Sequence, residues 1–194
     1  MPKRGLAFLA RVVRDGFNTL WEDSTPEPAE GIGELLRVGE SQTVEFKSTA
    51  RWNLHTGRPD KKMEHVITKT VCGFLNGQGG KLLIGVDDDG DIVGLGPDLQ
   101  TLRKGNKDGY KLFLRQLLDD SLSVPTAGIV HISFEAVADE DVCVLSASSS
   151  GKPVFTKPHE GGTGHSEFWV RIGNATKQLH GDDMLEYQTY HWGT

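Results

Sequence analysis

The first 21 residues carry apolar side chains at helical spacing, which predicts an amphipathic helix. Its apolar stripe consists of Leu9, Val13, Phe17 and Trp21. The next segment, residues 22–30, is rich in proline and acidic residues, as is typical of a linker. We therefore expect an N-terminal extension over residues 1–30 and a compact domain over residues 31–194. The stripe favours a homodimer with this helix in or beside the interface; the alternative is a monomer whose helix folds back on its own domain.

Within the compact domain the hydrophobic pattern predicts an α+β fold, a mixed β-sheet with about four packed helices. Helical spacing is found in residues 32–38, 61–76, 110–118 and 184–187. Strand patterns are found in residues 43–48, 81–86, 91–95, 128–137, 141–147, 153–157 and 167–173. The run 81–86 is almost entirely apolar, so we expect a central strand that is covered on both faces. Gly39 and Asp60 are placed to cap helices, and residues 49–62 predict a long polar loop.

The composition is that of an ordinary globular protein. Of the 194 residues, 37% are hydrophobic and 25% charged, and no apolar run approaches the roughly 20 residues that span a membrane. The net charge of −6 argues against non-specific nucleic-acid affinity over the whole protein surface, but it allows a local basic patch. Cys72 and Cys143 lie in apolar runs and are too few for a disulfide framework. We expect a cytoplasmic protein without membrane association.

Several familiar nucleotide- and metal-binding motifs are absent, or are matched only in part and in the wrong structural context. The glycine-rich run 76–85 follows a helix and precedes a strand, which is the reverse of a dinucleotide-binding turn. No phosphate-binding loop of the form G-x-x-x-x-G-K-[ST] is present. Residues 87–91, DDDGD, lack the glycine and glutamate positions of a calcium loop, so we interpret them as a hairpin turn.

Two glutamates near the first strand indicate a charged site. Glu45 lies within an apolar strand, on the face that alternation turns away from the core, and Lys47 shares that face. In a continuous strand Glu40 and Glu45 would lie roughly 16 Å apart and on opposite faces. They can converge only if the chain bends between them, and Gly39 and Ser41 allow such a bend.

Asp87 could complete a three-carboxylate site with Glu40 and Glu45, because it follows the central strand. Three adjacent carboxylates repel one another unless a cation intervenes. This arrangement predicts a Mg²⁺ or Mn²⁺ site, with Lys47 as a partial substitute for the ion. The alternative is structural: Glu45 and Lys47 pair on a solvated face, and Asp87 only caps a hairpin.

Motifs spread over most of the compact domain resemble the AlbA-2 domain of the Schlafen family. They are GESQTVEFKST, HVITKTVCGFLNGQGGKLLIGVDDDGDIVGL, VRIGNATKQL and YQTYHW, in the family's order. The resemblance implies a metal-dependent endoribonuclease that acts on structured RNA such as tRNA or rRNA, with its catalytic and metal-binding carboxylates at Glu40, Glu45 and Asp87. Nuclease-active relatives have a second lobe around a basic groove and a structural zinc site, and we expect neither feature in these 194 residues.

A basic segment after the first strand is the expected contact with nucleic acid. Between Lys47 and Lys69 there are six basic and two acidic residues, so six minus two leaves +4 in a chain of net charge −6. The expected contacts are Arg51, Trp52, Arg58, Lys61, Lys62, Lys69, Arg171 and Lys177. Trp52 and His55 are suited to stack on an unpaired base. The alternative is a loop whose charges are simply solvated.

Three functions therefore remain open at the level of sequence. The first is a Schlafen-like endoribonuclease that prefers RNA, with DNA binding possible, and in which Lys47 neutralises phosphate charge. The second is a non-catalytic DNA- or RNA-binding module with a regulatory role. The third is an interaction module that docks through its N-terminal helix.

Overall fold

The computed structural model describes residues 31–158 and 164–193. Its helices are α2 (Ile32–Val38), α3 (Lys61–Leu75), α4 (Gly96–Leu99), α5 (Lys107–Leu122), α6 (Val124–Gly128) and α7 (Gly181–Trp192). Its strands are β1 (Val44–Lys47), β2 (Trp52–Asn53), β3 (Arg58–Pro59), β4 (Gly80–Ile84), β5 (Val130–Val137), β6 (Glu140–Ala147), β7 (Phe168–Ile172) and β8 (Ala175–Leu179). The predicted N-terminal helix, its linker and the dimer interface assigned to them lie outside the described residues.

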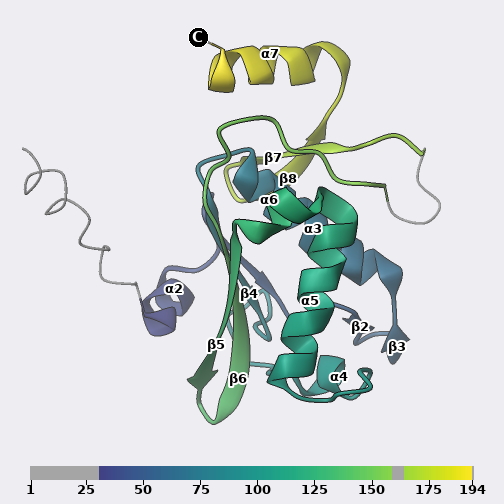
Figure 1. Ribbon diagram of the computed structural model, residues 1–194. Coiled ribbons are helices and arrows are strands. Elements are labelled where there is room, and N and C mark those ends of the chain that lie inside the picture. Colours follow the sequence, from purple (N-terminus) through teal and green to yellow (C-terminus); the bar gives the residue numbers. More distant parts are fainter. Residues whose placement is uncertain (1–30, 159–163, 194) are drawn as a thin grey trace, which may run out of the picture. The chain divides into compact units, whose positions relative to one another are not determined.

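Four strands form the main sheet, in the order β1-β4-β6-β5 (Figure 1). β1 and β4 run parallel, with Glu45 opposite Leu82, whereas β4 with β6 and β6 with β5 are antiparallel. β4 therefore has a neighbour on each side. Leu82, Leu83 and Ile84 are each 0% exposed, which confirms the prediction of a covered central strand.

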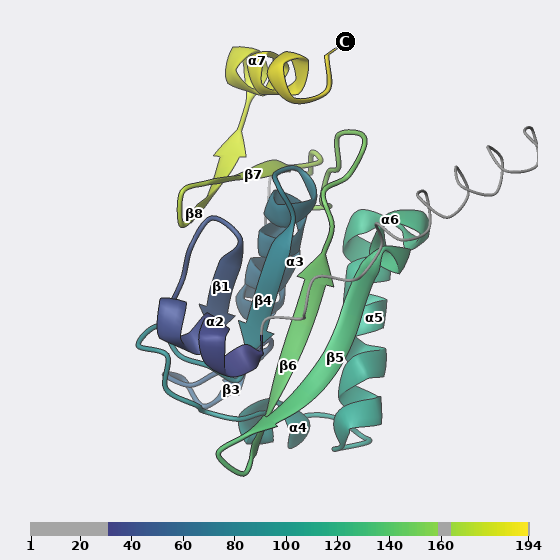
Figure 2. The same ribbon diagram turned by 90° about the vertical axis from the view of Figure 1, so that its left-hand side faces the viewer.

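Helices cover both faces of this sheet. Figures 1 and 2 show α2 on one face and α3 with α5 on the other. Leu83 packs with Leu35 of α2 in the smaller core cluster, whereas Leu82 and Ile84 belong to the larger cluster with Leu114 of α5. Because side chains alternate along a strand, β4 supplies both layers of the core.

The same alternation decides the surroundings of Glu45 on β1. Val44 and Phe46 belong to the cluster on the α2 side, so Glu45 faces the side of α3. The β7–β8 hairpin also contacts α3, and its Arg171 reaches Glu45. Glu45 is consequently 9% exposed. The prediction that this face of β1 points away from the core is wrong for Glu45, and so is the alternative of a solvated face. An opposite charge from a distant strand makes the burial of Glu45 possible.

The α+β prediction is confirmed, with six helices in the described part of the chain rather than about four. The predicted polar loop 49–62 contains the short antiparallel pair β2–β3. The predicted strands 91–95 and 153–157 are reduced to single bridges, Val86 with Ile92 and Thr156 with Glu167. β8, α4 and α6 were not predicted, because they are too short or too polar to show a period. No helix within the described ranges is long and apolar enough to cross a membrane.

Both predicted helix caps are present. Gly39 ends α2 with a φ of +82°, in the left-handed region that glycine adopts without strain, and its N–H donates to the Leu35 carbonyl at 3.0 Å. Asp60 begins α3, and its Oδ1 accepts a hydrogen bond from the backbone N–H of Lys62 at 2.9 Å.

Asp98 of α4 fixes the segment that leads from β1 into the β2–β3 hairpin. Its buried carboxylate accepts hydrogen bonds from the backbone N–H groups of Ala50, Arg51 and Trp52 at 2.6, 3.1 and 2.9 Å. The Tyr110 hydroxyl donates a fourth at 2.7 Å. Burial and the neighbouring Asp98 charge raise the pKa of Tyr110 well above its usual value, so the phenol remains a donor.

The C-terminal helix α7 attaches to the domain through two aromatic residues. The Tyr187 hydroxyl donates to the Asn76 carbonyl at 2.7 Å, and the Trp192 indole N–H donates to the Ser150 carbonyl at 2.9 Å.

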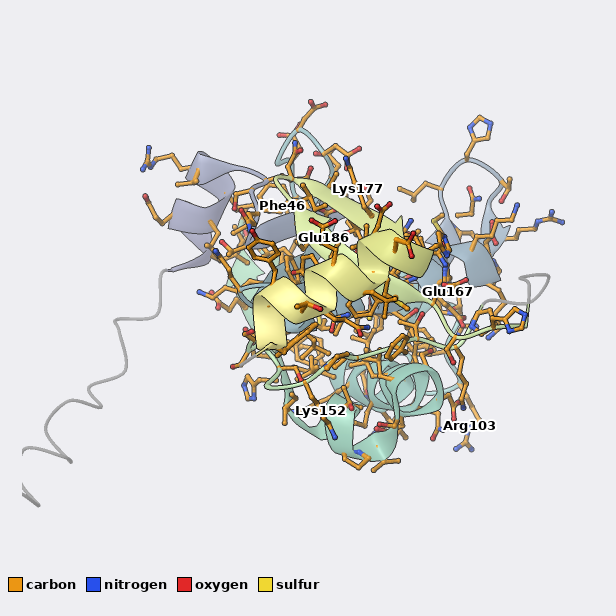
Figure 3. All side chains as sticks on the ribbon, turned by 90° about the horizontal axis from the view of Figure 1, so that it is seen from above. Phe46, Arg103, Lys152, Glu167, Lys177 and Glu186 are labelled. Carbon is orange, nitrogen blue, oxygen red and sulfur yellow. The ribbon has the colours of Figure 1, made fainter. Side chains whose placement is uncertain are left out.

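Figure 3, in which the molecule is seen from above, shows Lys177 and Lys152 on opposite sides of α7. The two lysines therefore belong to different parts of the surface.

Candidate functional site

A turn before β1 brings Glu40 back onto that strand. The N–H of Ser41 donates to the Val44 carbonyl at 2.9 Å. The N–H of Phe46 donates to Glu40 Oε1, also at 2.9 Å. The predicted bend between Glu40 and Glu45 is thus present, and it is closed by the Glu40 carboxylate itself.

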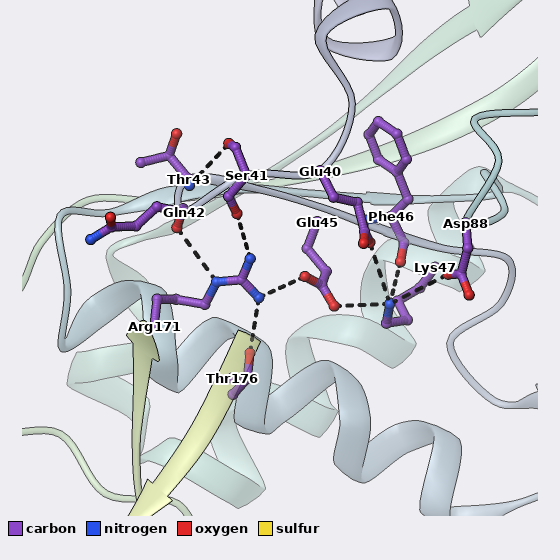
Figure 4. A network of polar contacts seen from close by, with 10 residues as sticks. All are labelled: Glu40, Ser41, Gln42, Thr43, Glu45, Phe46, Lys47, Asp88, Arg171 and Thr176. Atoms are coloured by element: carbon purple, nitrogen blue, oxygen red, sulfur yellow. Dashed lines mark hydrogen bonds and ion pairs between the residues drawn. The ribbon is translucent and has the colours of Figure 1, made fainter. Parts of the chain in front are cut away.

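Lys47 joins the two glutamates (Figure 4). Its Nζ lies 2.9 Å from Glu45 Oε1 and 3.7 Å from Glu40 Oε1, and it also donates to the Phe46 carbonyl. The side chains of Lys47 and Glu40 are 24% and 25% exposed, against 12% for Glu45. The network therefore opens to solvent at Lys47 and Glu40.

Arg171 holds Glu45 from the buried side. Its NH1 lies 2.6 Å from Glu45 Oε2 and donates to Thr176 Oγ1 at 3.1 Å. Its other nitrogens donate to the carbonyls of Ser41 and Gln42 at 2.5 and 3.4 Å. The Arg171 side chain is 1% exposed, so it cannot make the predicted contact with nucleic acid. We assign it as a positioning residue for Glu45.

The contacts of Asp87 lie within its own turn. Its Oδ1 accepts hydrogen bonds from the backbone N–H groups of Asp89 at 3.1 Å and Asp91 at 2.8 Å. This is the structural alternative, a carboxylate that caps a hairpin. The next residue approaches the network instead: Asp88 Oδ1 lies 3.9 Å from Lys47 Nζ, and its side chain is 87% exposed.

The donor set in this arrangement does not fit the predicted three-carboxylate metal site. In the described ranges 31–158 and 164–193, no group of three or more His, Cys, Asp or Glu side chains could hold a metal ion. Hard divalent cations require several oxygen ligands. Here the Lys47 ammonium lies within reach of both Glu40 and Glu45, and Arg171 takes the second oxygen of Glu45. We derive no chemical step through Mg²⁺ or Mn²⁺.

Exposure divides the predicted nucleic-acid contacts. The exposed ones are Arg58, Lys61, Lys62 and Lys177, and the partly covered ones are Arg51, Trp52 and Lys69. Arg51 lies over the Phe113 ring at 4.8 Å, with Nε 3.7 Å from Glu64 Oε1. The Lys69 ammonium lies 5.1 Å from the centre of the Trp169 ring. Arg51 and Lys69 therefore also stabilise the fold.

A cavity of about 240 Å³ lies beside the open end of the network. Its lining includes Lys47 and Asp88 from the network and residues 52–55 from the β2–β3 hairpin. A larger cavity of about 380 Å³ lies between α3 and α5 and contains none of the network residues.

Two positioning residues were not predicted from the sequence. Asp98 carries no signal beyond the Gly-Pro pair that begins its short helix. Arg171 does carry one: an arginine within the apolar run FWVRI is typical of a buried ion pair, since an unpaired charge in such a strand would be costly.

Comparisons with known proteins assign the sequence to a family. A model of the family described as Schlafen, AlbA_2 matches residues 40–180. No curated protein matches the chain. Similar solved structures include the DIP2311 protein from Corynebacterium diphtheriae, with a TM-score of 0.52 and 19% identity over 79% of this chain, which spans 28% of that protein. They also include the N-terminal domain of a putative ATP-dependent DNA helicase RecG-related protein from Nitrosomonas europaea, with a TM-score of 0.46 and 25% identity over 78% of this chain and 92% of that one.

Proposed function

Because this chain belongs to the Schlafen AlbA_2 family, we propose that it is a nucleic-acid-binding domain that cleaves RNA within the strand, at the network of Glu40, Glu45 and Lys47. The observation that carries the proposal is the Lys47 ammonium, which two glutamates hold in place at a partly exposed position. A phosphodiester is negatively charged, so an oriented ammonium close to the exposed basic hairpin is complementary to it.

Each member of the network has a distinct role in this proposal. Lys47 neutralises the charge that develops on the phosphate oxygens during cleavage. Glu40 is the more exposed carboxylate and accepts the proton of the attacking 2′-hydroxyl. The 2′-oxygen bonds to phosphorus as the bond from phosphorus to the 5′-oxygen breaks, and the leaving 5′-oxygen takes a proton from water. Glu45, fixed by Arg171, orients Lys47 and contacts no substrate.

Cleavage of total tRNA by the purified full chain tests the proposal. We expect fragments with the wild type and a loss of about 100-fold in rate for Lys47→Met and for Glu40→Gln. Lys152→Met is the matched control, because Lys152 is an exposed lysine on another part of the surface (Figure 3). Intact RNA with the wild type, or unchanged cleavage in both site variants, contradicts the proposal.

Dependence on Mg²⁺ or Mn²⁺ remains a separate prediction, which rests on the family resemblance alone. The same assay with EDTA, followed by re-addition of either ion, tests it. If cleavage stops with EDTA and returns with the ion, the prediction is correct. Cleavage that continues in EDTA assigns the chemistry to the residues of the chain.

A second candidate function, a non-catalytic DNA- or RNA-binding module, is favoured by one observation. Both oxygens of Glu45 already face cations, so the network is electrically compensated without a substrate or an ion. Gel shifts with RNA and duplex DNA, together with intact RNA under all ionic conditions, would support this candidate. The preference for RNA over DNA is read from the same gels.

The homodimer also remains a prediction, because the apolar stripe that motivates it lies within residues 1–21. Light scattering on the full chain tests it, and a monomeric mass contradicts it. A two-fold dimer would bring two basic hairpins to one RNA molecule and strengthen binding without new contacts.

A further inference from the structure

The cavity beside Lys47 has walls of two chemical kinds. Trp52, Leu54 and Met63 give it apolar and aromatic surface, whereas Lys47, Ser48 and Asp88 are its polar members next to the network. The Asp88 side chain is 87% exposed, so it can turn to solvent when an anion approaches Lys47. The Ser48 hydroxyl and the Trp52 indole N–H have no hydrogen-bond partner among residues 31–158 and 164–193. A ligand that matches this lining is flat and largely apolar, has polar edges and carries a negative charge on one side.

The size of the cavity is compatible with such a ligand. Its volume of about 240 Å³ is large enough to admit a single nucleobase. The phosphate of the same nucleotide would then lie at Lys47, on the side of Glu40 and Glu45.

The aromatic wall is held in place before any ligand arrives. The backbone N–H of Trp52 donates to the buried Asp98 carboxylate at 2.9 Å, and the Thr49 hydroxyl donates to the Trp52 backbone carbonyl at 2.5 Å. Trp52 also pairs with Pro59 of β3. A fixed backbone reduces the conformational entropy that is lost when a base stacks on the indole ring.

A basic side chain lies next to the same wall. In the β2–β3 ladder, Arg58 is the direct partner of Asn53, which lines the cavity, and the Arg58 side chain is exposed. Lys47 thus lines the cavity on the network side, and Arg58 is the strand partner of a lining residue on the hairpin side. A strand that places a base in the cavity can bring its neighbouring phosphates to these two cations.

We propose that this cavity receives one unpaired nucleobase of an RNA strand, stacked on Trp52, while the phosphate of that nucleotide lies at Lys47. The inference rests on the proposed function and deepens it, because it names the substrate class. A base within a duplex is covered on both faces by its neighbours and cannot enter the cavity. The domain therefore selects unpaired segments, such as the loops and ends of structured RNA, over continuous duplex.

Fluorescence anisotropy with the full chain in the Glu40→Gln background tests this without interference from cleavage. The probes are a labelled single-stranded oligouridylate, the same strand with abasic riboses, and a fully paired RNA duplex of equal length. We expect Trp52→Ala to weaken binding of the oligouridylate about tenfold and to leave the abasic strand and the duplex unchanged. Trp52→Phe retains most of the affinity because it keeps a stacking face. The matched control is Tyr190→Ala, which removes an aromatic side chain that is 88% exposed on α7, at the opposite end of the molecule (Figure 1).

The outcomes separate this inference from the proposed cleavage. If oligouridylate binding depends on Trp52 but the wild type never cleaves tRNA, the base site is kept and the nuclease is refuted. If the wild type cleaves tRNA but Trp52→Ala leaves the binding of oligouridylate unchanged, the base site is overturned and the nuclease is kept. If the Glu40→Gln chain binds none of the probes, the base site is wrong, and the tRNA assay alone then decides the nuclease.

Photocrosslinking of the wild type to a strand that contains 4-thiouridine gives an independent measurement that needs no variant to fold. We expect the crosslinked residue to be Trp52 or Met63. Crosslinks confined to β8 or α7 would overturn the base site.

Discussion

Asp98 and Glu45 are both buried carboxylates, but they are satisfied by different kinds of partner. Asp98, 1% exposed, accepts hydrogen bonds from three backbone N–H groups and one phenol, and none of these four donors carries a charge. Glu45, 9% exposed, lies between the guanidinium of Arg171 and the ammonium of Lys47. One carboxylate fixes the backbone, and the other fixes a cation.

This difference separates a structural from a functional role. The donors of Asp98 belong to the fold and have no other use, so its site is closed. Lys47, at the open end of the other network, is 24% exposed and can exchange part of its contact with Glu45 for a phosphate oxygen. Removal of the acceptor Asp98 should therefore reduce stability, whereas removal of the donor Lys47 should reduce RNA cleavage.

The largest effect on stability is expected for Asp98→Ala. The change leaves three backbone N–H groups and the Tyr110 hydroxyl without their acceptor, and each unsatisfied buried donor costs about 1–3 kcal/mol. We expect the free energy of unfolding in urea to fall by at least about 4 kcal/mol. Glu186→Ala, which removes an exposed carboxylate on α7 (Figure 3), is the control and should be neutral. A decrease no larger than that of the control would contradict the closed structural role of Asp98.

Arg171→Met should be the next most destabilising change. It leaves Glu45 buried beside a single partly exposed cation, and breaking a buried ion pair costs about 3 kcal/mol. The double variant Arg171→Met with Glu45→Gln removes the stranded charge, so we expect part of the stability to return in urea unfolding. Strictly additive losses would show that the two side chains are not coupled.

Lys47→Met should change the free energy of unfolding by less than about 1 kcal/mol, since partly exposed ion pairs contribute little. The same variant is expected to lose RNA cleavage. Urea unfolding and the tRNA assay on one protein preparation therefore give opposite results at Lys47 and at Asp98. If Lys47→Met unfolds as readily as Asp98→Ala, the network is structural and the comparison fails.

The local signals in the sequence predicted most of the fold. The almost wholly apolar run 81–86 predicted the central strand, and Gly39 and Asp60 marked the helix ends that they occupy. These features depend on a few consecutive residues, so they can be read without knowledge of the tertiary structure. The β2–β3 pair was missed because a strand of two residues has no period.

The candidate site was only partly predictable, because its charges are paired over long sequence distances. The bend between Glu40 and Glu45 is local and was predicted from Gly39 and Ser41. The partner of Glu45 is Arg171, 126 residues away, and no pattern within β1 shows that its polar face is covered. The same limit applies to Asp87: its position after a strand is visible, but the backbone donors that hold its carboxylate depend on the shape of the turn.

The smallest effect is expected at Asp60, a partly exposed carboxylate at the start of α3. The backbone N–H of Lys62 and, next, the side chain of Asn53 lower the pKa of Asp60 below its usual 3.8. A pKa that is lower in the folded state adds stability above the unfolded value, and this stability is lost as the pH falls through the folded value. We therefore expect Asp60→Ala to lower Tm slightly at neutral pH, and the difference from the wild type to vanish well below pH 3.8. Glu135→Ala, which removes an exposed carboxylate on β5, controls for the general titration of surface charge. A Tm difference that persists at low pH would mean that Asp60 stabilises α3 through the shape of its side chain rather than through its charge.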